Sequence, residues 1–134
     1  MSKHKLFSWP VRVYFQDTDA GGVVYHASYV NFMERSRTEW LRTFGYSNAR
    51  LMQELGVVFV VRSLKLDYLK PALLDDLLTV TSHVKEIGRS RVSILQTVVR
   101  GEDLLVQGEV HLVCVDVKSF KPVSVPDVLR KQWD

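Results

Sequence analysis

Cysteine is nearly absent from this sequence, since Cys114 is the only one. A single cysteine excludes a disulfide within the chain and any zinc site built from several thiolates. Because Cys114 stands in the apolar run Val110 to Val117, we predict a buried structural thiol at this position. Such cysteine usage is typical of a reducing compartment, and the cytoplasm is the expected location.

Long apolar runs are missing as well. No segment approaches the ~20 apolar residues of a membrane-spanning helix, and the residues after Lys3 and Lys5 do not form the apolar block of a secretion signal. Runs of like charge are also missing, because the 18 basic and 15 acidic residues, with a net charge of +3, are dispersed. This distribution disfavours a nucleic-acid partner but suits a small molecule that carries phosphate.

Metal and nucleotide signatures are the third absence. The histidines at positions 4, 26, 83 and 111 do not have the spacing of metal ligands. The glycines form neither a dinucleotide fingerprint nor a phosphate-binding loop of the P-loop type. We therefore expect no metal and no organic cofactor.

The residues that are present predict one α+β domain over residues 1–134. Alternating apolar and polar residues predict a strand at Leu6–Phe15, despite Pro10. Apolar residues at three- and four-residue spacing predict an amphipathic helix from Ser28 to Phe44 that ends at Gly45. Ser47 is expected to cap a shorter helix that covers residues 49–55 and ends at Gly56.

Strand material fills most of the remaining sequence. The expected strands are Val57–Leu69, Leu77–Ile87, Arg91–Arg100 and Leu104–Val117. Hairpin-length breaks between the last three favour an antiparallel sheet, and the apolar stripe of the long helix requires a sheet face to cover. The tail from Pro122 to Asp134 is expected to be a peripheral appendage.

The most informative segment is DTDAGGVVYH, from Asp17 to His26, where the first strand gives way to the long helix. Gly21 and Gly22 permit close backbone approaches, and the following helix start offers unpaired N–H groups that can hold an anion or a developing oxyanion. In extended chain the side chains of Asp17 and Asp19 lie on the same side, about 7 Å apart. The pattern alone leaves open whether these aspartates and His26 react or only make turn and helix-start contacts.

This segment and its flanks resemble the hotdog-fold acyl-CoA thioesterases. The match is closest to the Tol-Pal-associated, YbgC-type branch, which is related to 4-hydroxybenzoyl-CoA thioesterase. It extends from residue 11 through DTDAGGVVYHASYVNFMERSRTE and DYLKPA, with Asp75 and Asp76, to the strand that ends in VCVD at residue 116. The resemblance implies acyl-CoA hydrolysis on a curved antiparallel sheet wrapped around a central helix. It also implies assembly into homodimers or homotetramers with active sites between subunits.

The resemblance further implies roles for the residues of the motif. Asp19 is implied to be the catalytic carboxylate, acting either as general base or as nucleophile. His26 matches the histidine of the motif and is also implied to be catalytic, because its backbone N–H at the helix start corresponds to the group that polarises the thioester carbonyl. The expected supports of the turn and of the oxyanion are Gly21, Gly22 and Asp17. One departure is Phe15, because tyrosine is common at this position in the YbgC-type branch.

Substrate contacts are expected at two places. The hairpin after Lys85-Glu86 resembles the basic hairpin with which relatives meet the nucleotide end of coenzyme A, and guanidinium groups suit phosphate. The phosphate candidates are Arg89, Arg91 and Arg62. The acyl group is expected in an apolar groove beside the helix, lined by Tyr25, Tyr29 and Phe59. The alternative function is a noncatalytic module that binds acyl-CoA or acyl carrier protein in a lipid or envelope complex.

Overall fold

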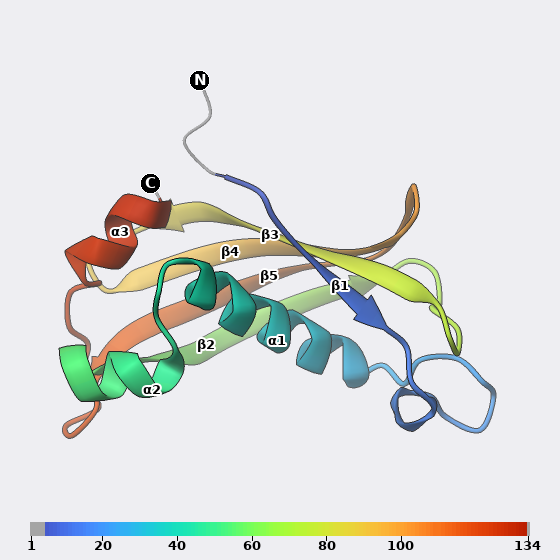
Figure 1. Cartoon of the computed structure of the whole chain (residues 1–134), viewed down its shortest axis with the longest axis horizontal. Coiled ribbons are helices and arrows are strands. Elements are labelled where there is room, and N and C mark those ends of the chain that lie inside the picture. Colours follow the sequence, from blue (N-terminus) through green and yellow to red (C-terminus); the bar gives the residue numbers. More distant parts are fainter. Residues whose placement is uncertain (1–4, 134) are drawn as a thin grey trace.

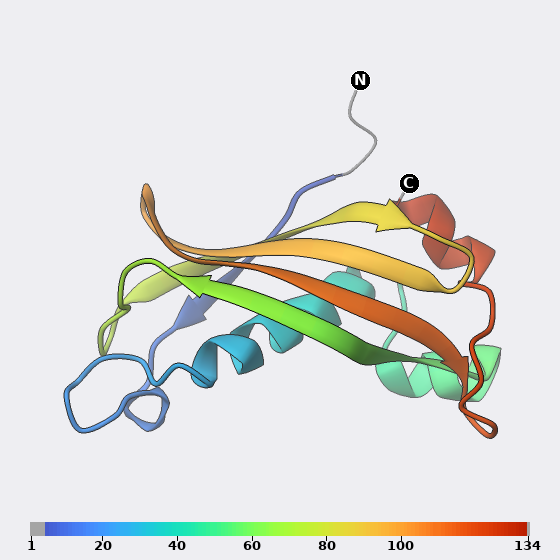
Figure 2. The ribbon, with the colours of Figure 1, turned by 180° about the vertical axis from the view of Figure 1, so that it is seen from behind.

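The computed structural model describes residues 5–133. Its sheet has five antiparallel strands in the spatial order β1-β3-β4-β5-β2. The strands are β1 (Phe7–Arg12), β2 (Val57–Tyr68), β3 (Leu77–Ile87), β4 (Arg91–Arg100) and β5 (Asp103–Asp116). The helix α1 (Ser28–Thr43) crosses one face of this sheet, and within residues 5–133 no helix covers the opposite face (Figures 1 and 2). The expected α+β class is confirmed.

The long helix forms where its sequence predicts it. The residues Tyr29, Phe32, Met33, Trp40 and Leu41 recur on one face and are buried against the sheet. The helix stops because Gly45 follows with a φ of +86°, a left-handed conformation that glycine adopts at little cost. The apolar stripe therefore fixes which side of the helix meets the sheet.

The buried apolar residues form two clusters, one toward each end of the helix. We call the first the loop-end cluster, which comprises Val13, Val24, Tyr29, Phe32, Met33, Ala72, Leu78, Val80, Val98, Leu105 and Val106. We call the second the tail-end cluster, which comprises Trp40, Leu41, Leu51, Val57, Val84, Val92, Ile94, Val110, Leu112, Cys114, Val125, Leu129 and Trp133. The helix α1 and the strands β3, β4 and β5 contribute residues to both clusters, because each runs from one end of the core to the other.

A buried polar row separates the two clusters. Gln96 lies between Ile94 and Val98 on β4, and its Nε2 donates to Ser82 Oγ at 2.9 Å and to the carbonyl of Met33 at 3.1 Å. The guanidinium of Arg37 donates to Gln96 Oε1 at 2.9 Å. Burial lowers the pKa of Arg37. The amide of Gln96 thus satisfies its hydrogen bonds inside the core, as buried polar groups require.

The C-terminal segment is not the peripheral appendage that the sequence predicts. It forms the helix α3 (Asp127–Trp133), in which Leu129 is fully buried and Trp133 is 6% exposed. The ring of Trp133 lies 6.0 Å from that of Trp40 and 5.7 Å from that of Phe59. The prediction was wrong because the apolar partners of this short helix lie far away in the sequence. Residue 134 of the predicted tail lies outside the described residues.

The first strand is shorter than predicted. It ends at Arg12, and residues Phe15–Asp17 form a 3-10 turn, η1. The turn forms because the carboxylate of Asp17 accepts the backbone N–H of Tyr14 at 2.8 Å. Phe15 is consequently 80% exposed instead of lying in the sheet.

The segment between α1 and β2 contains two short helical pieces. These are α2 (Asn48–Arg50) and the π-helical turn η2 (Leu51–Leu55). Ser47 Oγ caps the first by accepting the N–H of Arg50 at 3.1 Å, as predicted. Gly56 ends the second with a φ of +67°.

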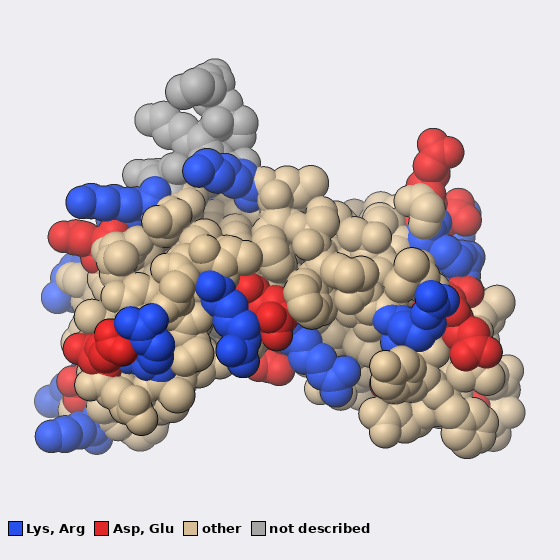
Figure 3. All heavy atoms as spheres, viewed as in Figure 1, with Lys and Arg blue, Asp and Glu red and all other residues tan. Residues whose placement is uncertain are grey.

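The lone thiol and the surface charges follow the sequence expectations. Cys114 has no exposed surface, and burial raises the pKa of its thiol to about 11. The expected buried thiol is confirmed. On the face in Figure 3, Lys and Arg side chains are interspersed with Asp and Glu and do not gather into one basic patch.

Candidate active site

The turn from Asp17 to His26 is closed by Asp17. The carbonyl of Asp17 accepts the N–H of Tyr25 at 2.9 Å and the hydroxyl of Ser28 at 3.2 Å. Its carboxylate accepts the backbone N–H of Tyr14, and Asp17 is only 8% exposed. Asp17 therefore links Tyr14, which precedes the turn, to Ser28, the first residue of α1.

Asp19 lies in the middle of the same turn and is exposed. Its Oδ1 accepts the N–H of Gly21 at 2.9 Å, and its carbonyl accepts the N–H of Gly22 at 3.1 Å. Gly22 has a φ of +80°, which a side chain disfavours. Within residues 5–133 the Oδ2 of Asp19 accepts no hydrogen bond. One carboxylate oxygen thus shapes the turn, and the other has no hydrogen-bond partner within residues 5–133.

A cavity of about 300 Å³ opens beside the start of α1. Its lining residues are Val24, His26, Tyr29, Tyr68, Leu69, Lys70 and Pro71. His26 lies two residues before the first residue of α1, and its carbonyl accepts the hydroxyl of Tyr68 at 3.0 Å. No acceptor for the backbone N–H of His26 is found in the described part of the chain. The cavity therefore lies against the start of α1, and its lining includes His26 but not Asp19.

Two tyrosines predicted as substrate contacts lie at this cavity or beside it. The ring of Tyr25 is half-exposed and packs 4.3 Å from the ring of His26. Tyr29 is buried in the cavity wall, and its hydroxyl accepts the N–H of Ala72 at 3.0 Å. Desolvation by burial raises the pKa of Tyr29. Tyr29 thus enters the cavity wall as a neutral side chain.

Phe59, the third predicted acyl contact, lies elsewhere. It lines a second cavity of about 290 Å³ together with Arg37, Trp40 and Trp133. Since neither His26 nor Tyr29 lines that cavity, a single chain does not bring the three aromatic candidates into one groove.

The predicted phosphate contacts are only partly brought together. Arg62 and Arg91 line a third cavity of about 520 Å³, which also contains Glu86 and His111. Ser93 and His111 pair across β4 and β5 on the sheet face away from α1, and their side chains meet at 2.9 Å. The side chain of Arg89 is exposed and does not line this cavity.

Tyr68 and Lys70 contribute to the first cavity, yet sequence reasoning gave them no role. Both stand in the DYLKPA segment that carries part of the family resemblance. The sequence therefore marked this segment as part of the family motif, but it did not show which residues the side chains of the segment contact. The bond from Tyr68 to His26 spans 42 positions of sequence, so no local pattern reveals it.

Two absences apply to the part of the chain that the structure describes. Residues 5–133 contain no helix long and apolar enough to cross a membrane. The same residues contain no group of three or more His, Cys, Asp or Glu side chains arranged to hold a metal ion. His4, one of the four histidines considered above, lies outside the described residues.

A five-stranded antiparallel sheet against one long helix, with an Asp-x-Gly-Gly turn before that helix, defines a hotdog-fold protein of the thioesterase class. The chain belongs to the thioesterase-like superfamily, whose model matches residues 13–133. The family resemblance and the hotdog fold are thus confirmed.

Similarity to individual proteins extends over nearly the whole chain. It is 47% identical to the acyl-CoA thioesterase YbgC of Haemophilus influenzae, with 92% of this chain and 91% of that protein covered. Identity to the acyl-CoA thioesterase YbgC of Helicobacter pylori is 31%, over 90% of this chain and 94% of that protein. Among solved structures, a probable thioesterase from Bartonella henselae matches with a TM-score of 0.87 and 34% identity, over 91% of this chain and 100% of that one.

Proposed function

We propose that this chain is an acyl-CoA thioesterase that hydrolyses the thioester to a free acid and coenzyme A. The observation that carries the proposal is the turn from Asp17 to His26, which holds the exposed carboxylate of Asp19 and, seven residues later, the backbone N–H of His26 just before α1. Asp19 does not line the cavity beside His26. A carboxylate and an N–H donor are the two groups that thioester hydrolysis needs, and we propose that the bound thioester lies between them. The names of the relatives in Haemophilus influenzae and Helicobacter pylori agree with this activity.

Asp19 is the proposed catalytic residue, and two routes use its ionised carboxylate. As general base, it takes a proton from a water molecule that attacks the thioester carbonyl. As nucleophile, it forms a mixed anhydride while the carbon–sulfur bond breaks, and water then hydrolyses the anhydride. In both routes the thiolate of coenzyme A leaves and takes up a proton.

The backbone N–H of His26 is the proposed oxyanion donor. One such donor typically lowers the barrier by about 3 kcal/mol, because it stabilises charge that develops only in the transition state. The side chain of His26 orients the substrate or the attacking water. Gly21, Gly22 and Asp17 support this role by fixing the shape of the turn.

The acyl group and the nucleotide end of the substrate have separate proposed contacts. The acyl group lies against Tyr25 and Tyr29. Arg62 and Arg91 bind phosphate, and their shared cavity supports this assignment. Arg89 joins them from the exposed hairpin. Phe59 contacts the acyl group only if the substrate also reaches the second cavity.

The proposed assembly is a homodimer or homotetramer in the cytoplasm. Within the described residues, β2 has a strand partner on one side only, so its outer edge is free. An edge of 12 residues is long for an unpaired strand and readily pairs with another chain. The exposed side chains of Val61 and Leu64 on this strand add apolar surface to such a contact. Analytical ultracentrifugation measures the assembly directly.

The decisive test replaces Asp19 with asparagine. Asp19→Asn keeps an oxygen that accepts the N–H of Gly21 but removes the ionised carboxylate. We expect kcat for free-thiol release from a panel of acyl-CoAs to fall at least about 100-fold. The matched control is Asp116→Asn, because Asp116 accepts the backbone N–H groups of Lys118 and Ser119 in a similar turn at the other end of the sheet.

The outcomes separate the two candidate functions. Undiminished turnover in a folded Asp19→Asn variant would refute the role of Asp19. Tight binding of acyl-CoA or acyl carrier protein, with no hydrolysis by the unmodified protein at any acyl length, would favour the noncatalytic binding module.

A further inference from the structure

The segment from Lys70 to Asp76 forms one wall of the candidate active site and also supports the catalytic turn. Its Ala72 carbonyl accepts the N–H of Val24 at 2.9 Å, and its Leu74 N–H donates to the carbonyl of Gly22 at 3.3 Å. Lys70 and Pro71, at the start of the segment, line the cavity beside His26. A displacement of this segment would therefore move both the cavity wall and the turn.

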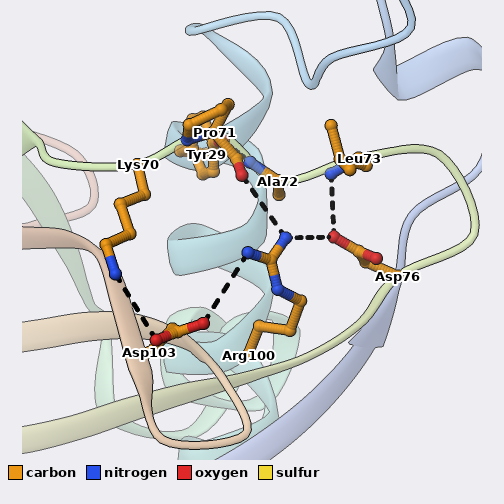
Figure 4. A network of polar contacts seen from close by, with 8 residues as sticks. All are labelled: Tyr29, Lys70, Pro71, Ala72, Leu73, Asp76, Arg100 and Asp103. Atoms are coloured by element: carbon orange, nitrogen blue, oxygen red, sulfur yellow. Dashed lines mark hydrogen bonds and ion pairs between the residues drawn. The ribbon is translucent and has the colours of Figure 1, made fainter.

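The end of this segment is held by backbone hydrogen bonds with Val13 and by Arg12, whose Nη1 donates to the carbonyl of Asp75 at 2.7 Å. A second guanidinium, that of Arg100, joins the two ends of the segment. Arg100, near the end of β4, donates to Asp76 Oδ2 at 2.7 Å and to the carbonyl of Pro71 at 3.4 Å. The same Asp76 oxygen accepts the N–H of Leu73 at 2.8 Å. Figure 4 shows how Arg100 reaches the segment at two points, one near each end.

The second arm of the guanidinium reaches the rim of the cavity. Arg100 Nη2 lies 3.9 Å from Asp103 Oδ2, and the other oxygen of Asp103 accepts Lys70 Nζ at 3.4 Å (Figure 4). Lys70 is thus connected to Arg100 through Asp103. These outer contacts are more exposed than the pair of Arg100 with Asp76, whose side chains are 33% and 20% exposed.

The pKa values agree with a charged pair at the centre of this network. The hydrogen bond to Asp76 raises the pKa of Arg100. Burial opposes ionisation of Asp76, but the hydrogen bonds from Arg100 and from the Leu73 N–H outweigh it and hold the pKa of Asp76 below its ordinary value. Such charge-assisted hydrogen bonds are stronger than neutral ones.

We propose that Arg100 is a positioning residue for thioester hydrolysis, which acts through Asp76 and the segment 70–76 on the turn that carries Asp19 and His26. This proposal rests on the proposed function of that turn. Arg100 does not line the cavity beside His26, so its effect passes mainly through the backbone bonds to Gly22 and Val24, with the exposed link through Asp103 to Lys70 as a second route. Arg100 therefore affects the placement of reacting groups more than the binding of substrate.

The test compares steady-state kinetics of Arg100→Gln, Arg100→Lys, Asp76→Asn and the double variant Arg100→Gln with Asp76→Asn. We expect kcat of Arg100→Gln to fall roughly 10- to 100-fold with KM within about threefold, since misplacement of reacting groups by about 1 Å can have this effect. Arg100→Lys should retain intermediate activity, because a compact ammonium can pair with Asp76 but lacks the planar fork of N–H groups that extends to Pro71 and Asp103 as well. The double variant should be no slower than the slower single variant, because the two groups act as one unit.

The matched control is Arg50→Gln, which removes an arginine from an ion pair with Glu54 at the opposite end of the molecule (Figure 1). It should leave kcat unchanged. Hydrogen exchange gives a readout that does not depend on activity. In Arg100→Gln, but not in Arg50→Gln, the amides of Val24 and Leu74 should exchange faster.

The possible results are distinct. Unchanged kcat together with unchanged exchange at Val24 and Leu74 in Arg100→Gln would overturn the proposal. A kcat loss that multiplies in the double variant would overturn it as well. Absence of hydrolysis by the unmodified protein would refute the proposed function. In that case, the exchange rates alone decide whether Arg100 positions the turn.

Discussion

The two ends of the core are held together by different forces. In the tail-end cluster, aromatic rings pack on one another, with Trp133 within 6.2 Å of the rings of Trp40, Phe44 and Phe59. At the loop end, the turn after η1 and the segment 70–76 are held by hydrogen bonds and by the pair of Arg100 with Asp76. Both ends contain an apolar cluster and a cavity, but the tail-end cavity is walled by aromatic rings, whereas the loop-end cavity lies beside a turn shaped by hydrogen bonds.

This difference separates the aromatic packing of the tail end from the turn that carries Asp19 and His26. Closely packed apolar surface contributes strongly to the free energy of unfolding but offers no reactive group. The row of Arg37, Ser82 and Gln96 lies between the two clusters. Because residues that are far apart and share no partner contribute almost independently, substitutions among the tail-end aromatic rings should change stability and leave the turn from Asp17 to His26 intact, whereas loss of the polar contacts around that turn should change activity.

The largest expected effect is the loss of stability in Trp133→Ala. Removal of this 6% exposed ring should lower the free energy of unfolding by about 3 to 5 kcal/mol, because it leaves a cavity beside Trp40 and Phe59. Urea denaturation measures the loss, and kcat of the folded protein should stay within about twofold. The control Val128→Ala, in the same helix but 38% exposed, should change stability by about 0.5 kcal/mol or less.

A loss below about 1 kcal/mol in Trp133→Ala would contradict the structure of the tail end, because so small a value is typical of a surface position. It would instead agree with the peripheral tail that the sequence predicts. A parallel loss of kcat would show that the two ends are coupled through the core.

The next effect is on activity, in Tyr68→Phe. The hydroxyl of Tyr68 donates to the carbonyl of His26, which lies at the start of α1. Loss of this hydrogen bond should lower kcat about three- to tenfold, equivalent to ~1 kcal/mol, because His26, whose N–H is the proposed oxyanion donor, loses a support at its carbonyl. Thiol-release kinetics measures the change in kcat, and urea denaturation of the same sample shows whether the free energy of unfolding changes as well.

The control for this variant is Tyr46→Phe. Tyr46 lies near the tail end, where its ring packs against the guanidinium of Arg50 at 5.0 Å from the ring centroid. The same loss of a hydroxyl there should leave kcat unchanged. Equal kinetic effects in the two variants would argue against a specific role of the bond from Tyr68 to His26.

Local patterns in the sequence predicted much of the sheet. The bounds of Leu77–Ile87 and Arg91–Arg100 agree with those in the structure. Alternation within each strand and the short break between them carry all of the required information. The contacts of α3 could not be predicted this way, because Trp133 is buried only once Trp40 and Phe59, which are distant in sequence, have been brought together.

The candidate site divides in the same way. The turn at Asp19, Gly21 and Gly22 is a local arrangement, so its residue types indicated its shape. The supports of that turn come from elsewhere in the chain. Arg100 pairs with an aspartate 24 positions before it, and neither residue stands in a pattern that indicates the other. Sequence therefore indicated the candidate catalytic segment but not the residues that hold it.

The smallest expected effect is that of Phe15→Tyr, which restores the tyrosine that is common in the YbgC-type branch. Phe15 is 80% exposed and does not line the cavity beside His26, so an added hydroxyl should change the free energy of unfolding by less than ~0.5 kcal/mol. We expect kcat to remain within about twofold, since the hydroxyl would gain no contact with the reacting groups.

The control is Phe120→Tyr, the same change on a 64% exposed ring near the tail end. A tenfold rise of kcat in Phe15→Tyr alone would show that the phenol reaches the thioester. The active region would then extend from the cavity beside His26 to η1. Groups that hydrogen-bond the substrate would accordingly occupy a larger part of the loop end.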